Sequence, residues 1–356
     1  MYKFIAIILS CLITYPSYAA VDKILLQEML TTLNNKYLEH IDNISVANTG
    51  LSALHDLDNN LIISKGRDRF YIYYNHQINN FVAYPKDTDN IQQWSEALEK
   101  VINNAAELSE NISIKDFEIP DLMMKKITAD LDKYSAYYSQ YDYRENQEEN
   151  AIYTLYSDRI IDNDYLYIKA RIFNKQTANM VQQSLEKNPD IKGVILDLRG
   201  NSGGIFNEAL KVAGLFTENE IITYSAGRDN QNIHYYTSSE TPALYNGPLV
   251  IMIDGNTASA AEVLAGGMQE QSRAKLIGTR SFGKGTIQSI TKMSNGGKLV
   301  LTTAQFFTPS GKIIHNHGIT PDICLDTADD NSCRKSDRLK FENDITLSLR
   351  LLKGDI

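Results

Sequence analysis

The sequence is poor in cysteine, in basic charge and in long hydrophobic runs. It has three cysteines in 356 residues, and it contains no HExxH helix, P-loop or dinucleotide fingerprint, the usual signatures of zinc enzymes and nucleotide-binding proteins. Its net charge of −9 at pH 7, with no basic cluster, argues against nucleic acid or an anionic membrane as a partner. We therefore expect no metal, no cofactor and no nucleic-acid partner.

The one N-terminal hydrophobic run, residues 4–14, is too short to span a bilayer comfortably. It follows a single lysine and precedes a proline and the small-residue pattern Ser17-Tyr18-Ala19. This order is typical of a secretory signal peptide. We expect residues 1–19 to be removed and the mature chain to be exported to the periplasm, with secretion as the less favoured alternative.

Signal removal leaves two cysteines, Cys324 and Cys333, in the polar stretch CLDTADDNSC. In an oxidising compartment a disulfide could close this loop and stabilise it by about 2–3 kcal/mol. Two cysteines without a neighbouring histidine do not supply the four ligands of a structural zinc site. A local disulfide is therefore the role that we expect for them.

The N-terminal third has the apolar spacing of helices over Val21–Ile41 and Ile91–Leu108, and another helix is expected after Pro120. Between the first two, Leu61–Tyr74 contains two β-like runs around a polar turn, which predicts a hairpin. From Tyr165 onwards, strand-like and helix-like segments alternate. The chain is long enough for two domains, and this alternation predicts an α/β fold for the second.

Within this α/β region, a helix is expected over Thr177–Lys187, and the strand GVILDLR is expected after it. Further strands are expected over Lys298–Phe307 and Lys312–Ile323. A closing helix is expected over Phe341–Leu352, where leucine and isoleucine recur at helical positions.

The segment with the clearest chemistry runs from Gly247 to Gln288. Within it, Pro248–Ile253 is predicted to be a buried strand, Asp254–Thr257 a turn and Ala258–Gln269 a helix. Ser259 therefore lies where a helix begins. It can act as an N-cap, or as a nucleophile beside the positive end of the helix, where backbone N–H groups can hold an oxyanion.

A serine nucleophile needs a base, and this segment contains no histidine. It does contain Lys284, in a glycine-flanked turn that leads into a strand. Strand alternation places Lys284, Thr286 and Gln288 on one face, so the amine of Lys284 and the amide of Gln288 are expected on the same side of the strand. The lysine can accept the serine proton only in its neutral form, which requires burial away from carboxylates. A Ser-Lys pair is the simplest chemistry that these residues offer.

Several motifs of the sequence resemble one family. They are TASAAEVLAGGMQ, FGKGTIQ, DLRGNSGG at 197–204, TPSGKII at 308–314, HGITPDI at 317–323 and LDKYSAYY at 131–138. Together they look like the C-terminal processing peptidases, also called tail-specific proteases. The resemblance implies an α/β fold with a crotonase-like peptidase core, preceded here by a helical N-terminal region, and no cofactor.

The resemblance also implies a role for three side chains: Ser259 as nucleophile, Lys284 as general base and Gln288 as the residue that positions the lysine. The implied activity is that of an exported serine endopeptidase. It would hydrolyse protein substrates through an acyl-enzyme, in periplasmic processing or turnover. Relatives form dimers and larger rings, so a homo-oligomer is a further expectation.

The glycines of DLRGNSGG lie between a strand and a helix, where a tight turn presents its amides outward. They can be no more than a tight turn, or they can form an anion cradle. The resemblance implies an oxyanion hole made by the amides of Ala260 and Gly204, with Gly203 beside them. Asp197 and Arg199 are expected to hold the loop as an ion pair rather than to act in catalysis.

The chain departs from the family between LDKYSAYY and the strand that begins at Tyr165. Most relatives carry a PDZ domain here, which binds a substrate's C-terminus as an added strand, but residues 139–164 are too few for one. We therefore expect unaided cleavage of unstructured chains, or a separate adaptor protein. The expected division is a signal peptide (1–19), an N-terminal helical region with a hairpin (20–138), a connector (139–164) and a catalytic domain (165–356).

An alternative interpretation starts from Ser202. The sequence GNSGG fits the G-x-S-x-G nucleophile elbow of α/β-hydrolases, and Asp254 with His315 or His317 would complete a triad in the right order. It leaves the segments ASAAE and FGKGTIQ without a role.

A second alternative is a protein that keeps the fold but binds rather than cleaves, as some relatives of these peptidases do. The presence of Ser259, Lys284, Gln288 and the paired glycines favours an enzyme instead.

Overall fold

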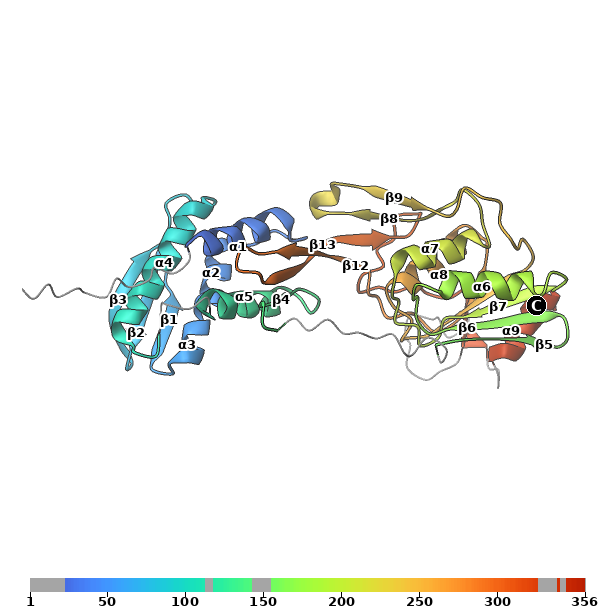
Figure 1. Ribbon diagram of the computed structural model, residues 1–356, viewed down its shortest axis with the longest axis horizontal. Helices are drawn as coiled ribbons and strands as arrows, with labels where there is room; N and C mark the ends of the chain where they lie inside the picture. The colour runs from blue at the N-terminus through green and yellow to red at the C-terminus, as the bar shows by residue number, and fades with distance from the viewer. Residues whose placement is uncertain (1–22, 113–117, 143–154, 326–337, 340–343, 356) are drawn as a thin grey trace, which may run out of the picture. The chain divides into compact units, whose positions relative to one another are not determined.

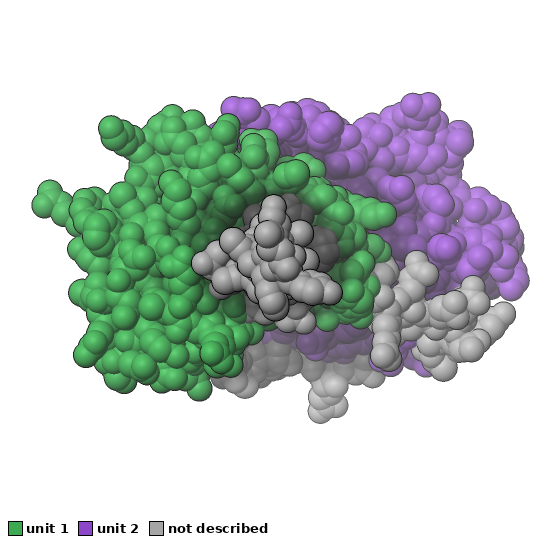
Figure 2. Space-filling model, turned by 60° about the vertical axis from the view of Figure 1, so that its left-hand side comes forward, with its two compact units in different colours: residues 1–143, 290–301 green, residues 144–289, 302–356 purple. Residues whose placement is uncertain are grey.

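The computed structural model describes residues 23–112, 118–142, 155–325, 338–339 and 344–355. The predicted signal peptide lies outside these ranges. The chain forms two compact units, drawn in green and purple in Figure 2: unit 1 comprises residues 1–143 and 290–301, and unit 2 comprises residues 144–289 and 302–356. Within the described ranges, no helix has the length and apolar character needed to cross a membrane.

Unit 1 combines helices with a small antiparallel sheet (Figure 1). Its elements are α1 (Lys23–Lys36), α2 (Asn43–Leu51), α3 (Ala53–Leu57), β1 (Leu61–Lys65), β2 (Arg69–Tyr74), β3 (Gln77–Ala83), α4 (Ile91–Leu108), α5 (Glu118–Leu131) and β4 (Ala136–Tyr138). Trp94 and Phe70 are fully buried at its centre. The predicted hairpin and the predicted helix over Ile91–Leu108 are confirmed, and the predicted helix over Val21–Ile41 ends earlier, at Lys36.

The central sheet of unit 2 has the strand order β15-β14-β11-β10-β7-β6-β5. Its strands are β5 (Tyr156–Ile161), β6 (Tyr165–Ala170), β7 (Gly193–Asp197), β10 (Leu249–Ile253), β11 (Lys275–Gly278), β14 (Ile323–Leu325) and β15 (Arg338–Leu339). Strand β5 is antiparallel to β6, and the pairs from β6 to β15 are parallel. The α/β fold predicted from the alternation is confirmed.

Alternating side chains of the central strands face two separate cores. On one face Ile251 packs with residues of α6 (Thr177–Glu186), α7 (Phe206–Gly214) and α8 (Ala260–Glu270). On the other face Val250 packs with Leu347 of α9 (Asp344–Lys353). The strands are buried on both sides, which explains why β7 and β10 are continuous apolar runs rather than alternating ones.

A second sheet has the strand order β12-β13-β8-β9. Its strands are β8 (Ile221–Ala226), β9 (His234–Thr237), β12 (Thr286–Lys292) and β13 (Lys298–Phe307), and β4 pairs with the start of β13. Residues 290–301, which contain the turn between β12 and β13, belong to unit 1.

The strand predicted over Lys312–Ile323 is wrong. That segment is a loop with a single bridge, between Phe307 and Ile313, and the next strand begins only at Ile323. Positive φ angles at Asn316 (61°) and Gly318 (67°) turn the backbone away from an extended path. Cys324, in β14, is disulfide-bonded, and its predicted partner Cys333 lies outside the described residues.

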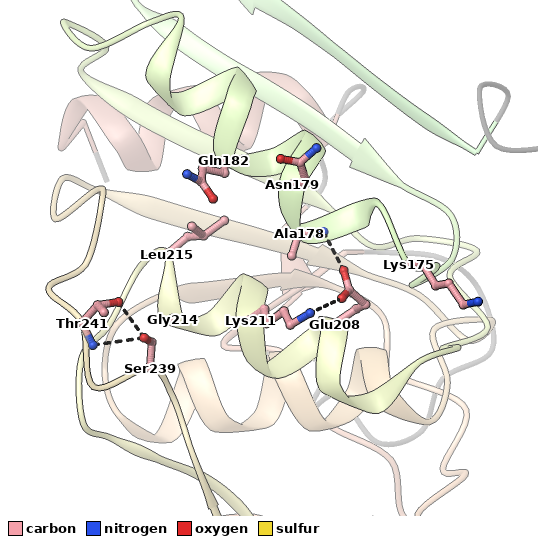
Figure 3. A pocket seen from close by; sticks show the side chains of 10 residues that line it. All are labelled: Lys175, Ala178, Asn179, Gln182, Glu208, Lys211, Gly214, Leu215, Ser239 and Thr241. Atoms are coloured by element: carbon pink, nitrogen blue, oxygen red, sulfur yellow. Dashed lines mark hydrogen bonds and ion pairs between the residues drawn. The ribbon is translucent and has the colours of Figure 1, made fainter.

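A buried carboxylate joins two helices of unit 2 (Figure 3). Glu208 of α7 accepts a hydrogen bond from the Ala178 N–H of α6 at 3.1 Å. Its other oxygen pairs with Lys211 Nζ at 2.8 Å. The acid thus satisfies an N–H group in the first turn of α6, where a negative charge is favoured.

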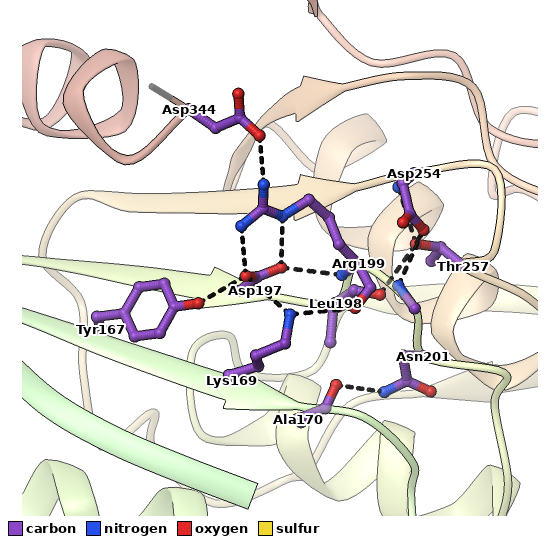
Figure 4. Close-up of polar contacts among 11 residues, drawn as sticks. Tyr167, Lys169, Ala170, Asp197, Leu198, Arg199, Asn201, Asp254, Thr257 and Asp344 are labelled. Carbon is purple, nitrogen blue, oxygen red and sulfur yellow. Dashed lines mark hydrogen bonds and ion pairs between the residues drawn. The ribbon is translucent and has the colours of Figure 1, made fainter. Parts of the chain in front are cut away.

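An ionic network centred on Asp197 lies at the end of β7 (Figure 4). Asp197 is fully buried and accepts hydrogen bonds from Tyr167 Oη (2.6 Å), Lys169 Nζ (3.0 Å), and Arg199 Nε (2.9 Å) and Nη2 (2.7 Å). Arg199 also pairs with Asp344, at the start of α9. The predicted ion pair between Asp197 and Arg199 is confirmed, and it connects β6, β7 and α9.

The network sets the ionisation of its members. Burial by itself raises the pKa of Asp197, but hydrogen bonds from Arg199 and Tyr167 outweigh it and hold that pKa at about 2. Burial and the hydrogen bond to Asp197 raise the pKa of Tyr167 to about 12. Since the folded-state pKa of Asp197 lies below the unfolded value of about 3.9, its contribution to stability is present above that value and is lost as the pH falls towards 2.

We expect Asp197→Asn to lower the free energy of unfolding at pH 7 by about 3 kcal/mol, because it leaves Arg199 and Lys169 beside a neutral amide. The wild-type stability should also fall between about pH 4 and pH 2, and the variant should lack this part of the fall. Urea denaturation at pH 7 and at pH 3 measures both effects.

The matched control is Asp164→Asn, which breaks the exposed pair between Asp164 and Lys192. Its effect should be about 0.5 kcal/mol or less. Equal losses in the two variants would contradict the role given to the Asp197 network.

Candidate active site

Three neighbouring parallel strands bring the predicted site segments to one edge of the sheet. Strand β10 pairs in parallel with β7 on one side and with β11 on the other. The glycine loop follows β7, Ser259 follows β10 and Lys284 follows β11. Because the carboxyl ends of parallel strands meet at the same edge, residues far apart in the sequence are collected there.

Ser259 occupies the N-cap position of α8 in an unusual backbone conformation, φ 57° and ψ −123°. The N-caps Asp42 and Asn90 of this chain have extended conformations, and their side chains accept N–H groups of the first helical turn. Capping alone therefore does not require the conformation of Ser259. A non-glycine residue held in such a region costs about 1–3 kcal/mol, and such residues cluster at functional sites.

The turn before Ser259 is fixed by backbone partners on both sides. Thr257 is fully buried, and its hydroxyl donates to the Leu198 carbonyl at 2.9 Å. Its own carbonyl accepts from the Phe282 N–H at 2.9 Å, and the Ala258 N–H donates to the Asn201 carbonyl at 2.8 Å. The serine turn is thus bonded to the glycine loop and to the loop that carries Lys284.

The glycine loop packs directly against Ser259. A Cβ at Gly203 would lie 2.8 Å from Ser259 Cβ and 3.1 Å from the Ala260 nitrogen, so only glycine fits here. Gly204 has a φ of 121° and forms a β-bridge with Phe173. In this bridge the Phe173 N–H donates to the Gly203 carbonyl, and the Ile205 N–H donates to the Phe173 carbonyl. The bridge therefore leaves the Gly204 N–H unused.

Buried polar side chains hold this loop in place. Asn201 is fully buried; its Nδ2 donates to the Ala170 carbonyl (3.0 Å) and its Oδ1 accepts from the Gly203 N–H (2.8 Å). Asp254 Oδ1 accepts from the Gly200 N–H at 2.9 Å. These contacts preorganise the loop, which is what an oxyanion site requires.

A single carboxylate joins the serine turn to the lysine loop. Glu262 Oε2 accepts the N–H of Ser259 and the N–H of Lys284, each at 2.8 Å. The two backbone nitrogens are therefore within two hydrogen-bond lengths of each other. Both residues are half-buried, which leaves part of each side chain accessible.

Glu262 is the residue that the sequence reasoning missed. A signal was present, because Ser259 and Glu262 have the Ser-x-x-Glu spacing of a capping box. A capping box, however, predicts only a helix start. It does not predict that the same carboxylate also binds a loop more than twenty residues further along the chain.

Gln288 lies on β12, on the same face as Thr286, as the alternation predicted. Its Nε2 donates to the hydroxyl of Thr286 at 2.9 Å and to that of Thr302 at 3.2 Å. Both threonines are buried. The amide is thus held in one orientation by β12 and β13.

The structure does not favour the alternative nucleophile Ser202. In a nucleophile elbow the serine itself occupies the strained turn, and among the described residues Ser259, not Ser202, has a positive φ. Asp254, the acid of that alternative, bonds the backbone and hydroxyl of its own turn and the Gly200 N–H. His317 Nδ1 contacts the carbonyl of His315. These contacts do not form a triad around Ser202.

Two cavities of unit 2 lie away from Ser259 and Lys284. One, of about 310 Å³, lies beside Glu208 and Lys211, and the other, of about 500 Å³, lies at the C-terminal end of α8 beside Glu270 and Lys312. In the described part of the chain, no group of three His, Cys, Asp or Glu side chains could hold a metal ion.

Comparison with known proteins identifies one part of the chain. Residues 164–325 match the model of peptidase family S41. A carboxy-terminal-processing protease of Bartonella bacilliformis is 36% identical over 172 residues, which is 47% of this chain and 40% of that protein. A carboxyl-terminal-processing protease of Synechocystis is 38% identical over 148 residues, 42% of this chain and 34% of that protein. The chain thus matches less than half the length of these relatives.

A solved structure extends the likeness to most of the chain. A lipoprotein from Streptococcus agalactiae matches with a TM-score of 0.52 and 18% identity, over 90% of this chain and 100% of that one. At this identity the match shows a shared fold only. Residues 164–325 are thus similar to peptidase family S41, a family of serine peptidases, and to C-terminal processing proteases.

Proposed function

We propose that this protein is a serine endopeptidase that hydrolyses protein substrates through an acyl-enzyme on Ser259. One observation carries the proposal: the Glu262 carboxylate joins the turn of Ser259, held at φ 57°, to the backbone of Lys284. The match of residues 164–325 to peptidase family S41 supports the reaction class. The parallel sheet with helices on both faces is consistent with the crotonase-like core that we assign to unit 2.

In the proposed mechanism, neutral Lys284 accepts the proton of the Ser259 hydroxyl as the serine attacks the substrate carbonyl. The lysine then gives this proton to the leaving amine, and water releases the acyl group. Gln288, held by Thr286 and Thr302, positions the lysine. A side chain that only orients the base contributes less than the base itself.

The negative oxygen of the tetrahedral intermediate is assigned to two backbone amides. Ala260 is the first residue of α8, where N–H groups have no partner within the helix and a negative charge is favoured. Gly204 supplies the second N–H, which its bridge with Phe173 leaves unused. The close packing of Gly203 against Ser259 and the Ala260 nitrogen holds the glycine loop beside the nucleophile.

For substrates, we propose unstructured protein chains, taken without a PDZ domain or through a separate adaptor protein. The support is the short connector 139–164, whose end is already used by β5 in pairing with β6. The homologous proteases are named for carboxy-terminal processing. We leave the recognition of C-terminal tails outside the proposal, because the segment that would carry a PDZ domain is too short.

We further propose that the protein is exported and acts in the periplasm. The support is the signal-peptide pattern of residues 1–19 and the disulfide at Cys324, since disulfides persist in oxidising compartments.

We expect Ser259→Ala and Lys284→Ala each to lower the cleavage of casein by the mature chain by about 10⁴-fold or more, because each removes a reacting group. Gln288→Ala should cost less, on the order of a hundredfold. Release of fluorescent peptides from labelled casein measures these rates.

The control is Ser202→Ala, which should retain wild-type activity. Loss of activity in Ser202→Ala alone would favour the α/β-hydrolase alternative, and full activity in Lys284→Ala would reject the Ser-Lys pair. A wild-type chain that is inert towards casein and other unfolded proteins would favour the binding-protein alternative.

The pH profile of kcat/KM should fall on its acidic side, because the proposed mechanism requires the neutral amine of Lys284 to accept the serine proton. Initial rates on a fluorogenic peptide from pH 5 to pH 9 measure this limb, with the folded state checked by circular dichroism at each pH. A flat profile over this range would count against a lysine base.

A further inference from the structure

Glu262 is a buried acid for which the proposed reaction has no step. It lies in the first turn of α8, and its exposed fraction is 0%. Burial raises the pKa of its carboxyl, against the hydrogen bonds that it accepts. The hydrogen-bond donors around it are backbone N–H groups and a hydroxyl, not cations. Burying an acid without a cation costs free energy unless hydrogen-bond donors satisfy its oxygens. The donors around Glu262 therefore decide whether its burial is tolerated.

Four donors surround the carboxylate, two on each oxygen. Oε2 accepts the N–H groups of Ser259 and Lys284, each at 2.8 Å. Oε1 accepts the Ser281 hydroxyl and the Gly283 N–H, each at 2.6 Å. Three of the four are backbone N–H groups, which can only donate, so the acceptor-only ionised form fits this site.

The donors come from the two segments that would carry the reacting groups. One belongs to the serine turn, and the other three belong to the loop that ends in Lys284. Ser281 is further anchored, because its hydroxyl accepts the Ile319 N–H at 2.6 Å and its own N–H donates to the Ile319 carbonyl at 3.1 Å. The lysine loop is thereby fixed on one side by α8 and on the other by residue 319.

The bond to Ser259 also bears on its backbone. At φ 57° the residue is in a region that other contacts must maintain. The N–H of Ser259 reaches Glu262 Oε2 in this conformation, and the same oxygen holds Lys284. A change in the carboxylate would therefore move the nucleophile and the base relative to each other.

We propose that Glu262 is a positioning residue of the active site, whose carboxylate holds the Ser259 turn and the Lys284 loop in a fixed position relative to each other. This inference rests on the proposed function, since it assigns Glu262 to the reaction of Ser259 and Lys284. Glu262 touches neither the substrate nor the reacting atoms. It contributes by fixing the position of Ser259 relative to Lys284, since a displacement of about 1 Å between reacting groups can lower the rate a hundredfold.

The test compares Glu262→Ala and Glu262→Gln with Glu208→Ala in the mature chain. Glu208 is the matched control, because it is also a buried glutamate that accepts a backbone N–H, but it lies on α7 beside Ala178. The measurements are kcat and KM on a fluorogenic peptide, the rate of Ser259 labelling by a fluorophosphonate, and Tm.

We expect Glu262→Ala to lower kcat and the labelling rate by about a hundredfold or more, with KM changed by less than about threefold. Glu262→Gln keeps one acceptor oxygen, so it should restore part of this loss, to about a tenfold reduction. Glu208→Ala should lower Tm but leave kcat and labelling within about twofold of the wild type. If Glu262→Ala does not fold, Glu262→Gln carries the test.

Wild-type kcat in folded Glu262→Ala, or in folded Glu262→Gln if the alanine variant does not fold, would overturn the inference. So would a loss in kcat that Glu208→Ala reproduces at the same Tm, since this would reduce Glu262 to a general stabilising residue. These results leave the proposed function intact. A wild-type chain that neither cleaves the peptide nor labels at Ser259 would reject the proposed function itself and this inference with it.

Discussion

The parallel pairing of β7, β10 and β11 is the constraint on which the site depends. Their hydrogen bonds align the three strands in one direction, so the three segments that follow them leave the sheet at the same edge. The glycine loop, the turn of Ser259 and the loop of Lys284 meet there although they are distant in the sequence. The two cores on either face of the sheet bury these strands and keep them in register.

Two buried carboxylates hold the loops at that edge in different ways. Asp197 is paired with charged groups, Arg199 and Lys169, and it connects the start of the glycine loop to α9. Glu262 accepts bonds from three backbone N–H groups and a hydroxyl. The Asp197 network connects strands and a helix through charged partners, whereas Glu262 joins two loops through backbone N–H groups and a hydroxyl.

The sequence pattern predicted those helices and strands whose formation depends mainly on local interactions. The helix over Ile91–Leu108 has the predicted bounds, because an apolar stripe and the N-cap Asn90 both mark it. Strands β3 and β5 were not predicted, since their exposed polar residues give no clear alternation and their pairing with β2 and β6 depends on tertiary contact. After residue 312 the sequence predicted a strand where the structure has a loop, because Asn316 and Gly318 turn the backbone within an apolar segment.

The sequence by itself determined the chemistry that is available: a serine at a helix start, a lysine between glycines, and a glycine-rich turn after a buried strand. It could not determine which serine is held in a strained conformation, because Ser202 and Ser259 both follow strands in small-residue turns. Only the tertiary structure gives Ser259 its positive φ, packs Gly203 on it and bonds Glu262 to the lysine loop. Such contacts join residues separated by many positions, and neither propensity nor periodicity, which act over one or two turns of chain, carries information about them.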